Sequence, residues 1–289
     1  MNFFLKIYYV YFSKFGVVYN KINFCISHFL NFKEIKYRKK IYKNKISLIK
    51  NDKIDFILSK LNTEGYYMTN LKEFDIDFDI SQEINSSKTD HLNQSKKAFF
   101  SNLYSFEPDD NISKFSINKN FIELISKYLK LSPIINNIQL IKSEIASDNK
   151  FYSSMNWHID NHHNNLIKIM YLPYDLNYKD GPTCFLNKNS TKNLLTNNFY
   201  FKSPRYFADD ELKKVKDNYI DEVVSFTGKK GDILIIDTSK CLHMGSRCNS
   251  ERYQLFITYT PIETNDLNTL SSIKKYKFLN EKIKSLNIY

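Results

Sequence analysis

The region between residues 137 and 260 is broken into short runs rich in β-branched, apolar and aromatic residues, and this pattern limits the fold more than any other feature. Short runs of this kind, bounded by turn residues, are typical of β-sandwiches and β-barrels. The pattern therefore predicts a mainly β fold. Seven runs have this character: residues 138–145, 155–160, 166–172, 183–186, 222–226, 232–237 and 252–260.

Two turns support antiparallel, hairpin-like connections between these runs. Residues 179–182 read Lys-Asp-Gly-Pro, and residues 228–231 read Gly-Lys-Lys-Gly. Gly and Pro provide the backbone angles that tight turns require, so both segments are expected to reverse the chain.

The sequence before residue 136 has a helical pattern instead. Apolar residues recur at helical spacing at Ile54, Ile57 and Leu61, and again between residues 121 and 131. We expect residues 1–135 to form a helical and irregular cap that packs on the core.

The chain is expected to be a single catalytic domain, because 289 residues can bury one substantial core. This core is assigned to residues 136–262, and a C-terminal helical extension to residues 263–289. An insertion over one end of the core is expected at residues 191–221, where three acidic residues precede a helical segment that begins at Leu212. Acidic residues favour helix N-termini because they interact well with the helix dipole.

The positive charge of the chain does not indicate nucleic-acid binding. The formal net charge is +11, but the excess comes from Lys residues spread through a background of Asn, Ile, Tyr and Phe. A nucleic-acid site would instead require a clustered basic face. We therefore expect a mildly basic, solvated surface and no nucleic-acid partner.

The cysteines and the N-terminal stretch bear on the location of the protein. The 4 Cys residues include no Cys-x-x-Cys pair, which favours a reducing cytoplasm. Lys6, Lys14 and Lys21 interrupt the apolar N-terminal stretch well before the roughly 20 residues that span a bilayer, and no signal-peptide pattern is present. We expect no transmembrane segment. Weak peripheral association with a membrane surface stays open as an alternative, since Lys beside aromatic residues suits an interfacial helix.

Three residues are candidate metal ligands and catalytic residues. His158 and Asp160 are two positions apart in a strand-like run, and such positions lie on the same face of a strand. His243 follows the apolar run 233–236 and would enter the site from a neighbouring strand. Two imidazoles and one carboxylate leave one face of an octahedral ion open, which suits Fe(II) that binds a cosubstrate and oxygen.

Arg252 is a candidate for binding a carboxylate of that cosubstrate. It opens the run 252–260, nine residues after His243. A guanidinium at this place can hold a carboxylate through a paired, bidentate contact, as the tail of 2-oxoglutarate would require. Arg247 competes for this role, but its position in the turn after His243 favours surface exposure.

Several motifs accompany these residues in a specific order. They are Trp-His-Ile-Asp at 157–160, Met-Tyr-Leu-Pro-Tyr-Asp at 170–175, Asp-Gly-Pro at 180–182, Pro-Arg-Tyr-Phe at 204–207 and the stretch from Gly231 to Gly245. In order and spacing, residues 128–262 resemble the phytanoyl-CoA dioxygenase-like group of Fe(II), 2-oxoglutarate-dependent oxygenases. One departure is at residues 186–190, which read Leu-Asn-Lys-Asn-Ser, whereas that family commonly has Gly-Ser-His at the end of this segment.

The resemblance implies a double-stranded β-helix, or jelly-roll, core. It also implies that His158, Asp160 and His243 bind iron and that Arg252 anchors 2-oxoglutarate. The implied reaction converts 2-oxoglutarate and O2 to succinate and CO2 and hydroxylates a small-molecule or lipid-like substrate. Retention of Asp160 argues against a halogenase, since those relatives lack a carboxylate at this position.

Four residues near the proposed ligands are assigned to other roles. His162 and His163 are expected on the loop that follows the metal-binding run. Cys241 is expected to be a buried, inert thiol. Trp157 is expected to face away from the metal and to pack in the core.

Two other functions stay open from the sequence. A cupin-like jelly-roll enzyme could use the same ligands with Zn or Mn, because ligand type alone does not select iron. A non-catalytic binding protein could also keep the fold. Arg252 favours the oxygenase, because the cupin-like enzyme needs no 2-oxoglutarate anchor, and the intact ligand triad argues against a protein that has lost its metal site.

Overall fold

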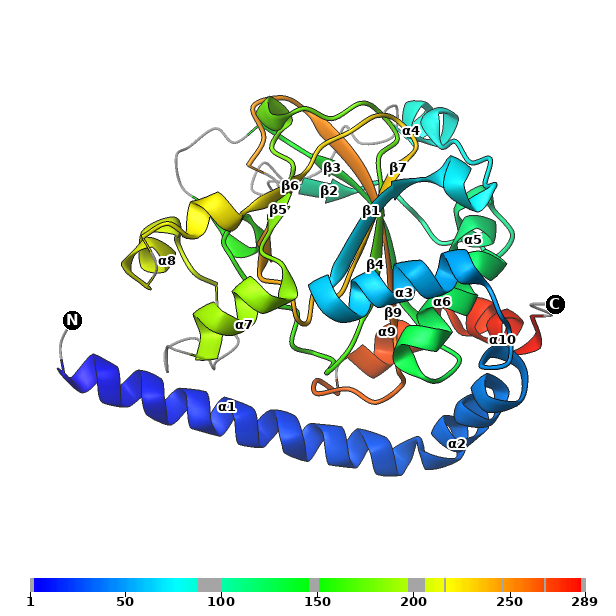
Figure 1. The fold of residues 1–289 in the computed structure, drawn as a ribbon, viewed down its shortest axis with the longest axis horizontal. Helices are drawn as coiled ribbons and strands as arrows, with labels where there is room; N and C mark the ends of the chain where they lie inside the picture. Colours follow the sequence, from blue (N-terminus) through cyan, green and yellow to red (C-terminus); the bar gives the residue numbers. More distant parts are fainter. Residues whose placement is uncertain are drawn as a thin grey trace.

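The computed structural model describes residues 3–87, 100–145, 151–196, 206–215, 217–245, 247–267 and 269–286. It contains two antiparallel β-sheets and a set of helices that covers the larger sheet (Figure 1). The fold is therefore mixed α/β with antiparallel sheets, which agrees in part with the expected β core and helical additions, although helices make up more of the chain than expected. The physical reason is that the central strands are apolar on both faces, so each face of the large sheet must be covered.

The larger sheet has six strands in the order β1-β7-β4-β9-β3-β2, and neighbouring strands are antiparallel. Alternate residues of β7 illustrate its two apolar faces. Ile233 and Ile235 pack in the cluster beneath the helices, whereas Leu234 and Ile236 pack toward the smaller sheet. The strands are β1 (Tyr66–Asn70), β2 (Phe100–Asn102), β3 (Ile134–Ser143), β4 (Ile167–Tyr171), β7 (Asp232–Ile236) and β9 (Arg252–Thr260).

The smaller sheet has the order β6-β5-β8. Its strands are β5 (Thr183–Phe185), β6 (Val224–Phe226) and β8 (His243–Met244). Phe185 and Phe226 pack against the apolar side chains of β4 and β7 that face them. A single-residue bridge between His158 and His243 extends this sheet by one further segment.

Helices α3, α5, α6 and α10 cover the outer face of the large sheet (Figure 1). Helix α3 begins after Asn51, whose side chain accepts a hydrogen bond from Ile54 N, and it ends at Gly65 with φ +85°. A Cβ on Gly65 would lie 2.6 Å from Sγ of Cys241, so this close approach also requires glycine. The α-helices are α1 (Phe3–Leu30), α2 (Phe32–Ile41), α3 (Asp52–Glu64), α4 (Ser81–Ser87), α5 (Asn111–Ser116), α6 (Lys119–Leu129), α7 (Lys188–Thr196), α8 (Asp209–Val215), α9 (Thr269–Lys275) and α10 (Lys277–Ser285).

Shorter helical turns complete the described chain. The π-helix η1 (Tyr42–Ile46) follows α2 directly. The 3-10 turns are η2 (Leu71–Phe74), η3 (Ser153–Met155), η4 (Tyr178–Asp180) and η6 (Tyr219–Glu222).

Six of the seven strand-like runs contain β-strands, and one prediction was wrong. Residues 155–160 form no regular strand: η3 ends at Met155, and the following residues are held by bonds to three separate segments. Trp157 N donates to Phe207 O (3.0 Å), His158 N to His243 O (2.8 Å) and Asp160 N to Thr238 O (3.0 Å). The chain is extended here, as the alternation predicted, but no single partner strand runs alongside it.

The region expected to be only a cap also supplies sheet structure. Strands β1 and β2 both precede residue 136 and form the two edges of the large sheet. In the expected insertion, α8 begins at Asp209, three residues before the predicted start. Residues 197–205, with Pro204 and Arg205 of the Pro-Arg-Tyr-Phe motif, lie outside the described residues.

Candidate metal centre

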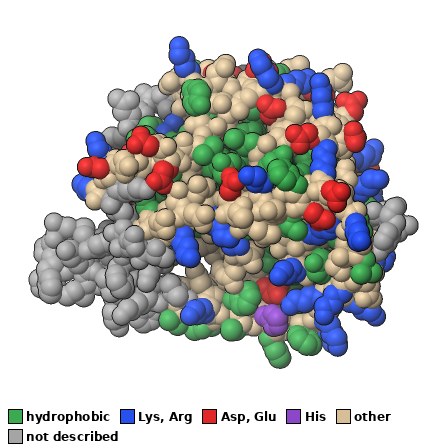
Figure 2. Space-filling view, in the orientation of Figure 1, with side chains coloured by type: hydrophobic (Ala, Val, Ile, Leu, Met, Phe, Trp, Pro, Cys, Tyr) green, Lys and Arg blue, Asp and Glu red, His purple; other side chains and the backbone are tan. Residues whose placement is uncertain are grey.

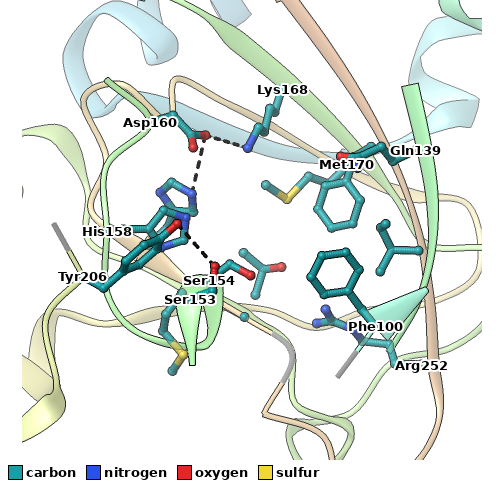
Figure 3. Close-up of a pocket in the computed structure, with 16 residues that line it drawn as sticks. Phe100, Gln139, Ser153, Ser154, His158, Asp160, Lys168, Met170, Tyr206 and Arg252 are labelled. Atoms are coloured by element: carbon teal, nitrogen blue, oxygen red, sulfur yellow. Dashed lines mark hydrogen bonds and ion pairs between the residues drawn. The ribbon is translucent and has the colours of Figure 1, made fainter. Parts of the chain in front are cut away.

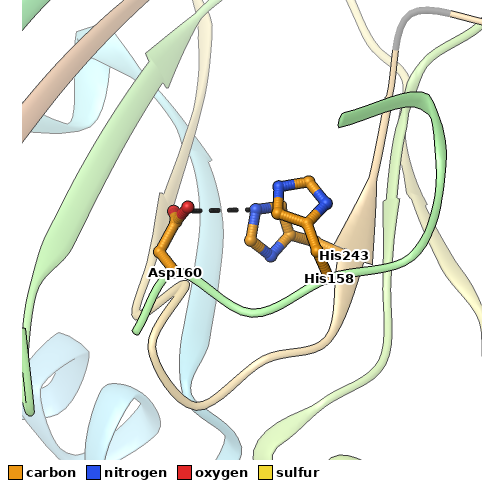
Figure 4. Close-up of side chains that lie close together, drawn as sticks. All are labelled: His158, Asp160 and His243. Atoms are coloured by element: carbon orange, nitrogen blue, oxygen red, sulfur yellow. Dashed lines mark ion pairs between the residues drawn. The ribbon is translucent and has the colours of Figure 1, made fainter. Parts of the chain in front are cut away.

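His158, Asp160 and His243 lie together, and one ligand atom from each falls within 4.8 Å of the others (Figure 4). The two histidines are direct partners in an antiparallel bridge, with His158 N to His243 O at 2.8 Å and His243 N to His158 O at 2.9 Å. Their ring centroids are consequently only 4.2 Å apart. The structure therefore brings together the three residues that the sequence analysis proposed as ligands.

Both imidazoles are oriented by backbone carbonyl groups. Nδ1 of His158 lies 2.9 Å from Asn156 O, and Nδ1 of His243 lies 3.0 Å from Cys241 O. A carbonyl oxygen can only accept, so Nδ1 of each ring carries the hydrogen and Nε2 keeps its lone pair. This tautomer is the one that metal-binding histidines adopt.

The two histidines are held neutral by their surroundings. Burial lowers the pKa of His158 below its usual value. Burial, together with the neighbouring His158, lowers the pKa of His243 to about 3. Both side chains are therefore available as uncharged ligands throughout the physiological range.

Asp160 is an ionised carboxylate with two close donors on one oxygen. Lys168 Nζ and Thr238 Oγ1 each lie 2.6 Å from its Oδ2, and His243 Nε2 lies 3.7 Å from the same atom. Burial alone would raise the pKa of Asp160, but the positive charge of Lys168 and the nearby imidazoles hold it well below its usual range. The site therefore presents one negative charge to a cation.

Lys168 and Thr238 were missed by the sequence analysis. Lys168 lies on β4, where Ile167, Ile169 and Tyr171 point to the helix-covered face. By strand parity, Lys168 and Met170 must point the other way, into the pocket (Figure 3). A lone charged residue in an otherwise apolar strand was the signal that could have identified it.

A cavity of about 300 Å³ opens beside the three candidate ligands. The triad and Lys168 form one wall, and Arg252 lies on the opposite side beside Phe100 (Figure 3). Apolar side chains from several strands separate the two walls: Phe100, Ile141, Met170 and Phe256. The cavity therefore has the Asp160–Lys168 ion pair at one end, the Arg252 guanidinium at the other and apolar side chains in its lining.

Arg252 lines this cavity at the start of β9 and is 3% exposed. One terminal nitrogen donates to Gly181 O (2.5 Å), and the other lies 3.5 Å from Ser143 Oγ. Burial lowers the pKa of the guanidinium. These contacts fix the direction of the side chain while it stays next to the cavity.

Arg247 is not the surface residue that its turn position suggested. Its Nε donates to Met155 O (2.7 Å), one terminal nitrogen contacts Asp209 Oδ2 (2.6 Å), and the guanidinium lies 4.0 Å from the Phe151 ring centre. Its side chain is 15% exposed. The expectation failed because both polar partners are far away in the sequence. Arg247 ties the loop after β8 to α8 and does not line the cavity.

The neighbouring residues have structural roles. His163 is 1% exposed, with Nδ1 2.7 Å from Glu263 O and Nε2 3.3 Å from Asn136, so it is separate from the ligand group. Cys241 is buried, and burial raises the pKa of its thiol. Trp157 is buried and donates to Asp209 Oδ1 at 2.8 Å, which confirms that it packs away from the cavity.

Comparisons with known proteins were made at the level of sequence and of structure. No protein-family profile and no curated protein matches the sequence. Among solved structures, the epimerase SnoN in complex with Fe3+, alpha ketoglutarate and nogalamycin RO is 12% identical over 72% of this chain and 84% of its own, with a TM-score of 0.44. The carbocyclase SnoK is 8% identical, covering 75% and 85% with a TM-score of 0.47. HygX from Streptomyces hygroscopicus, with nickel and 2-oxoglutarate bound, is 9% identical, covering 71% and 86% with a TM-score of 0.45. Similarity at this level leaves the activity to be inferred from the residues of the site.

Proposed function

We propose that the protein is an Fe(II), 2-oxoglutarate-dependent oxygenase in which His158, Asp160 and His243 bind the metal. The observation that carries this proposal is the convergence of these three ligand atoms within 4.8 Å at one wall of a cavity. Two neutral imidazoles with free Nε2 atoms and one ionised carboxylate form the donor set that Fe(II) oxygenases use, with coordination positions left for other ligands.

We also propose that the two sheets form the jelly-roll core that the resemblance to phytanoyl-CoA dioxygenase-like enzymes implies. The antiparallel order β2-β3-β9-β4-β7-β1 faces the order β6-β5-β8, and the His158 bridge continues the smaller sheet. The metal ligands then lie at the end of the barrel, which supports an active site there. This core, with the preceding and following helices, would form one catalytic domain.

Iron held by His158, Asp160 and His243 would supply the redox chemistry that couples 2-oxoglutarate to O2. The overall reaction would convert 2-oxoglutarate, O2 and a substrate C–H bond to succinate, CO2 and a hydroxylated product, with one oxygen atom of O2 in succinate and the other in the new hydroxyl group. Arg252 would bind the distal carboxylate of 2-oxoglutarate through its planar fork. Burial of Arg252 strengthens this contact because few water molecules compete for the charge.

The remaining cavity wall suggests the kind of substrate. Phe100, Ile141 and Phe256 offer apolar contacts, and Tyr206 lies at the edge of the cavity with its ring centre 5.1 Å from that of His158. Such a lining suits a small-molecule or lipid-like substrate with an unactivated carbon.

The four cysteines are free thiols, in agreement with a reducing compartment such as the cytoplasm.

Anaerobic spectroscopy tests the proposal. Adding 2-oxoglutarate to the Fe(II)-loaded protein should produce a new absorption band, and admitting O2 should release succinate. Metal binding without any effect of 2-oxoglutarate on the spectrum would contradict the oxygenase and favour a cupin-like enzyme. Failure to bind any divalent metal would contradict both.

A further inference from the structure

Two polar side chains in the second half of helix α1, Asn23 and Ser27, face the protein. Asn23 is 4% exposed, and its Nδ2 donates to Asn265 O at 3.0 Å. Ser27 is fully buried, with Oγ 3.5 Å from Ile262 O and 3.1 Å from the Thr264 N–H that donates to it. Polar contacts therefore attach the second half of α1 to the loop that follows β9.

The opposite side of α1 is apolar and faces solvent. Val18 and Ile22 are each 53% exposed, and Phe29 is 82% exposed. These positions are four and seven residues apart, which places them on one side of a helix with 3.6 residues per turn. Tyr19, Ile26 and Leu30 flank them and are also exposed. A surface helix that contributes to a core turns its apolar side inward, whereas α1 turns its apolar side outward. An exposed apolar stripe of this kind marks an interaction surface.

Lysines border this stripe where the chain continues into α2 and η1. Exposed lysines stand at positions 33, 36, 39, 40 and 43. The only acidic residue between positions 16 and 50 is Glu34, which pairs with Arg38 (2.9 Å) and Lys284 (3.3 Å). Blue and green side chains gather along the lower edge of Figure 2, where Figure 1 places the end of α1 and the start of α2. The lysines and the apolar stripe therefore form one continuous surface.

We propose that this α1–α2 surface, consisting of the exposed apolar residues 18–32 and the lysines 33–43, binds the surface of an anionic phospholipid bilayer. Apolar side chains would enter the interface, and the lysines would meet the lipid phosphates. No helix in the described ranges combines the length and hydropathy needed to cross a membrane, so α1 would lie along the bilayer. A second copy of this chain is a poorer partner, because it would offer the same lysines and, between positions 16 and 50, no acidic residue other than Glu34 to pair with them.

The location of one cysteine gives a direct experiment. Cys25 is exposed, three residues after Ile22 on the same side of α1, whereas Cys184, Cys241 and Cys248 are buried. An environment-sensitive fluorophore on Cys25 of the full chain should shift to shorter wavelength with vesicles of phosphatidylcholine and phosphatidylserine. Vesicles of phosphatidylcholine alone should produce a weaker response. Neither measurement requires iron or 2-oxoglutarate, so this proposal can fail while the oxygenase proposal stands.

Vesicle sedimentation with unlabelled variants completes the test. Ile22→Glu combined with Phe29→Glu should weaken binding at least about 30-fold, because two apolar side chains no longer leave water. Lys36→Glu with Lys40→Glu should remove the preference for phosphatidylserine. Ile220→Glu is the matched control, since Ile220 is 60% exposed on η6, and this variant should bind as the wild type does.

Two outcomes would overturn the proposal. One is vesicle binding that is unchanged in the Ile22→Glu, Phe29→Glu variant. The other is that the wild-type chain binds no vesicles and forms a concentration-dependent dimer that the Ile22→Glu, Phe29→Glu variant does not form. That result would assign the surface to a second copy of the chain.

Discussion

Lys168 Nζ lies 2.6 Å from Oδ2 of Asp160, so a partly buried ammonium group already pairs with the carboxylate that we assign to the metal. The side chains are only 19% and 14% exposed. Thr238 donates to the same oxygen, whereas neither donor contacts Oδ1. Lys168 and Thr238 therefore hold the same oxygen that lies 3.7 Å from His243 Nε2, and a metal at this site would share the carboxylate with both donors.

We predict that Lys168→Met tightens binding of a divalent metal by about tenfold or more. A unit positive charge close to a ligand oxygen repels a divalent ion, and its removal relieves that repulsion. Titration with Mn(II), followed by electron paramagnetic resonance, measures the affinity. Thr238→Val is the control, because it removes a neutral donor and should not tighten binding. Weaker metal binding by Lys168→Met would contradict the prediction. It would show that the contribution of Lys168 to orienting Asp160 outweighs the repulsion between Lys168 and the metal ion.

We predict that His158→Ala abolishes succinate formation and leaves the fold intact. Asp160→Ala should also abolish it, but at a cost in stability, because Lys168 loses its partner in a buried site. The double variant Asp160→Ala, Lys168→Ala should recover part of that stability in chemical denaturation. Succinate formation at the wild-type rate in either single variant would rule out the ligand assignment.

We predict that Arg252→Ala weakens 2-oxoglutarate binding by at least roughly 30-fold, since truncating one partner of a buried charge pair costs about 2–5 kcal/mol. Fe(II) binding should persist. Arg252→Lys should restore only part of the affinity, because an ammonium lacks the planar fork. Anaerobic titration of 2-oxoglutarate into each Fe(II)-loaded variant provides the measurement.

Arg247→Ala is the matched control for that titration. It removes contacts to Met155 and Asp209, so it should lower the free energy of unfolding and leave 2-oxoglutarate affinity nearly unchanged. A larger loss of affinity in Arg247→Ala than in Arg252→Ala would reverse the assignment of the anchor.

We predict that the metal-free protein loses stability as the pH falls from about 6.5 toward 3. Burial lowers the pKa of His163 to about 3. In the unfolded chain this residue binds a proton near pH 6.5, whereas in the folded protein it stays neutral until near pH 3. The unfolded state therefore binds more protons in this window, and the free energy of unfolding falls by roughly 1.4 kcal/mol per pH unit for each such group.

Urea denaturation at several pH values checks this prediction. His163→Gln, which removes one titrating group away from the metal ligands, should show a shallower dependence on pH than the wild type. An identical slope in both proteins would mean that His163 does not carry the effect.

The sequence predicted elements whose pattern is local and missed features that depend on distant partners. Strands β4, β7 and β9 were predictable because their own residues are mostly β-branched, apolar or aromatic. His158, Asp160 and His243 could be proposed together because several motifs accompany them in a specific order. The pairing of residues 155–160 was not predictable, because the three segments that hold it follow much later in the chain. Edge strand β1, with the sequence Tyr-Tyr-Met-Thr-Asn, lacks a clear alternation and is fixed by its register with β7.

The same limit applied to the charged residues of the site. Nothing next to Lys168 in the sequence reveals that it reaches Asp160, since the contact depends on how β4 faces the irregular segment. Arg247 was assigned to the surface for the corresponding reason, because its partner Asp209 belongs to a separate helix.

The bridge between His158 and His243 has a consequence for how the protein would respond to its metal. The two residues close a loop that contains β4, β5, β6 and β7. An ion held by both imidazoles would fasten that loop at its base, much as a covalent cross-link does, and would reduce the entropy of any partly opened state. Metal occupancy would then set how often the smaller sheet separates from the segment that carries His158, and amide exchange in these strands would slow as the ion binds.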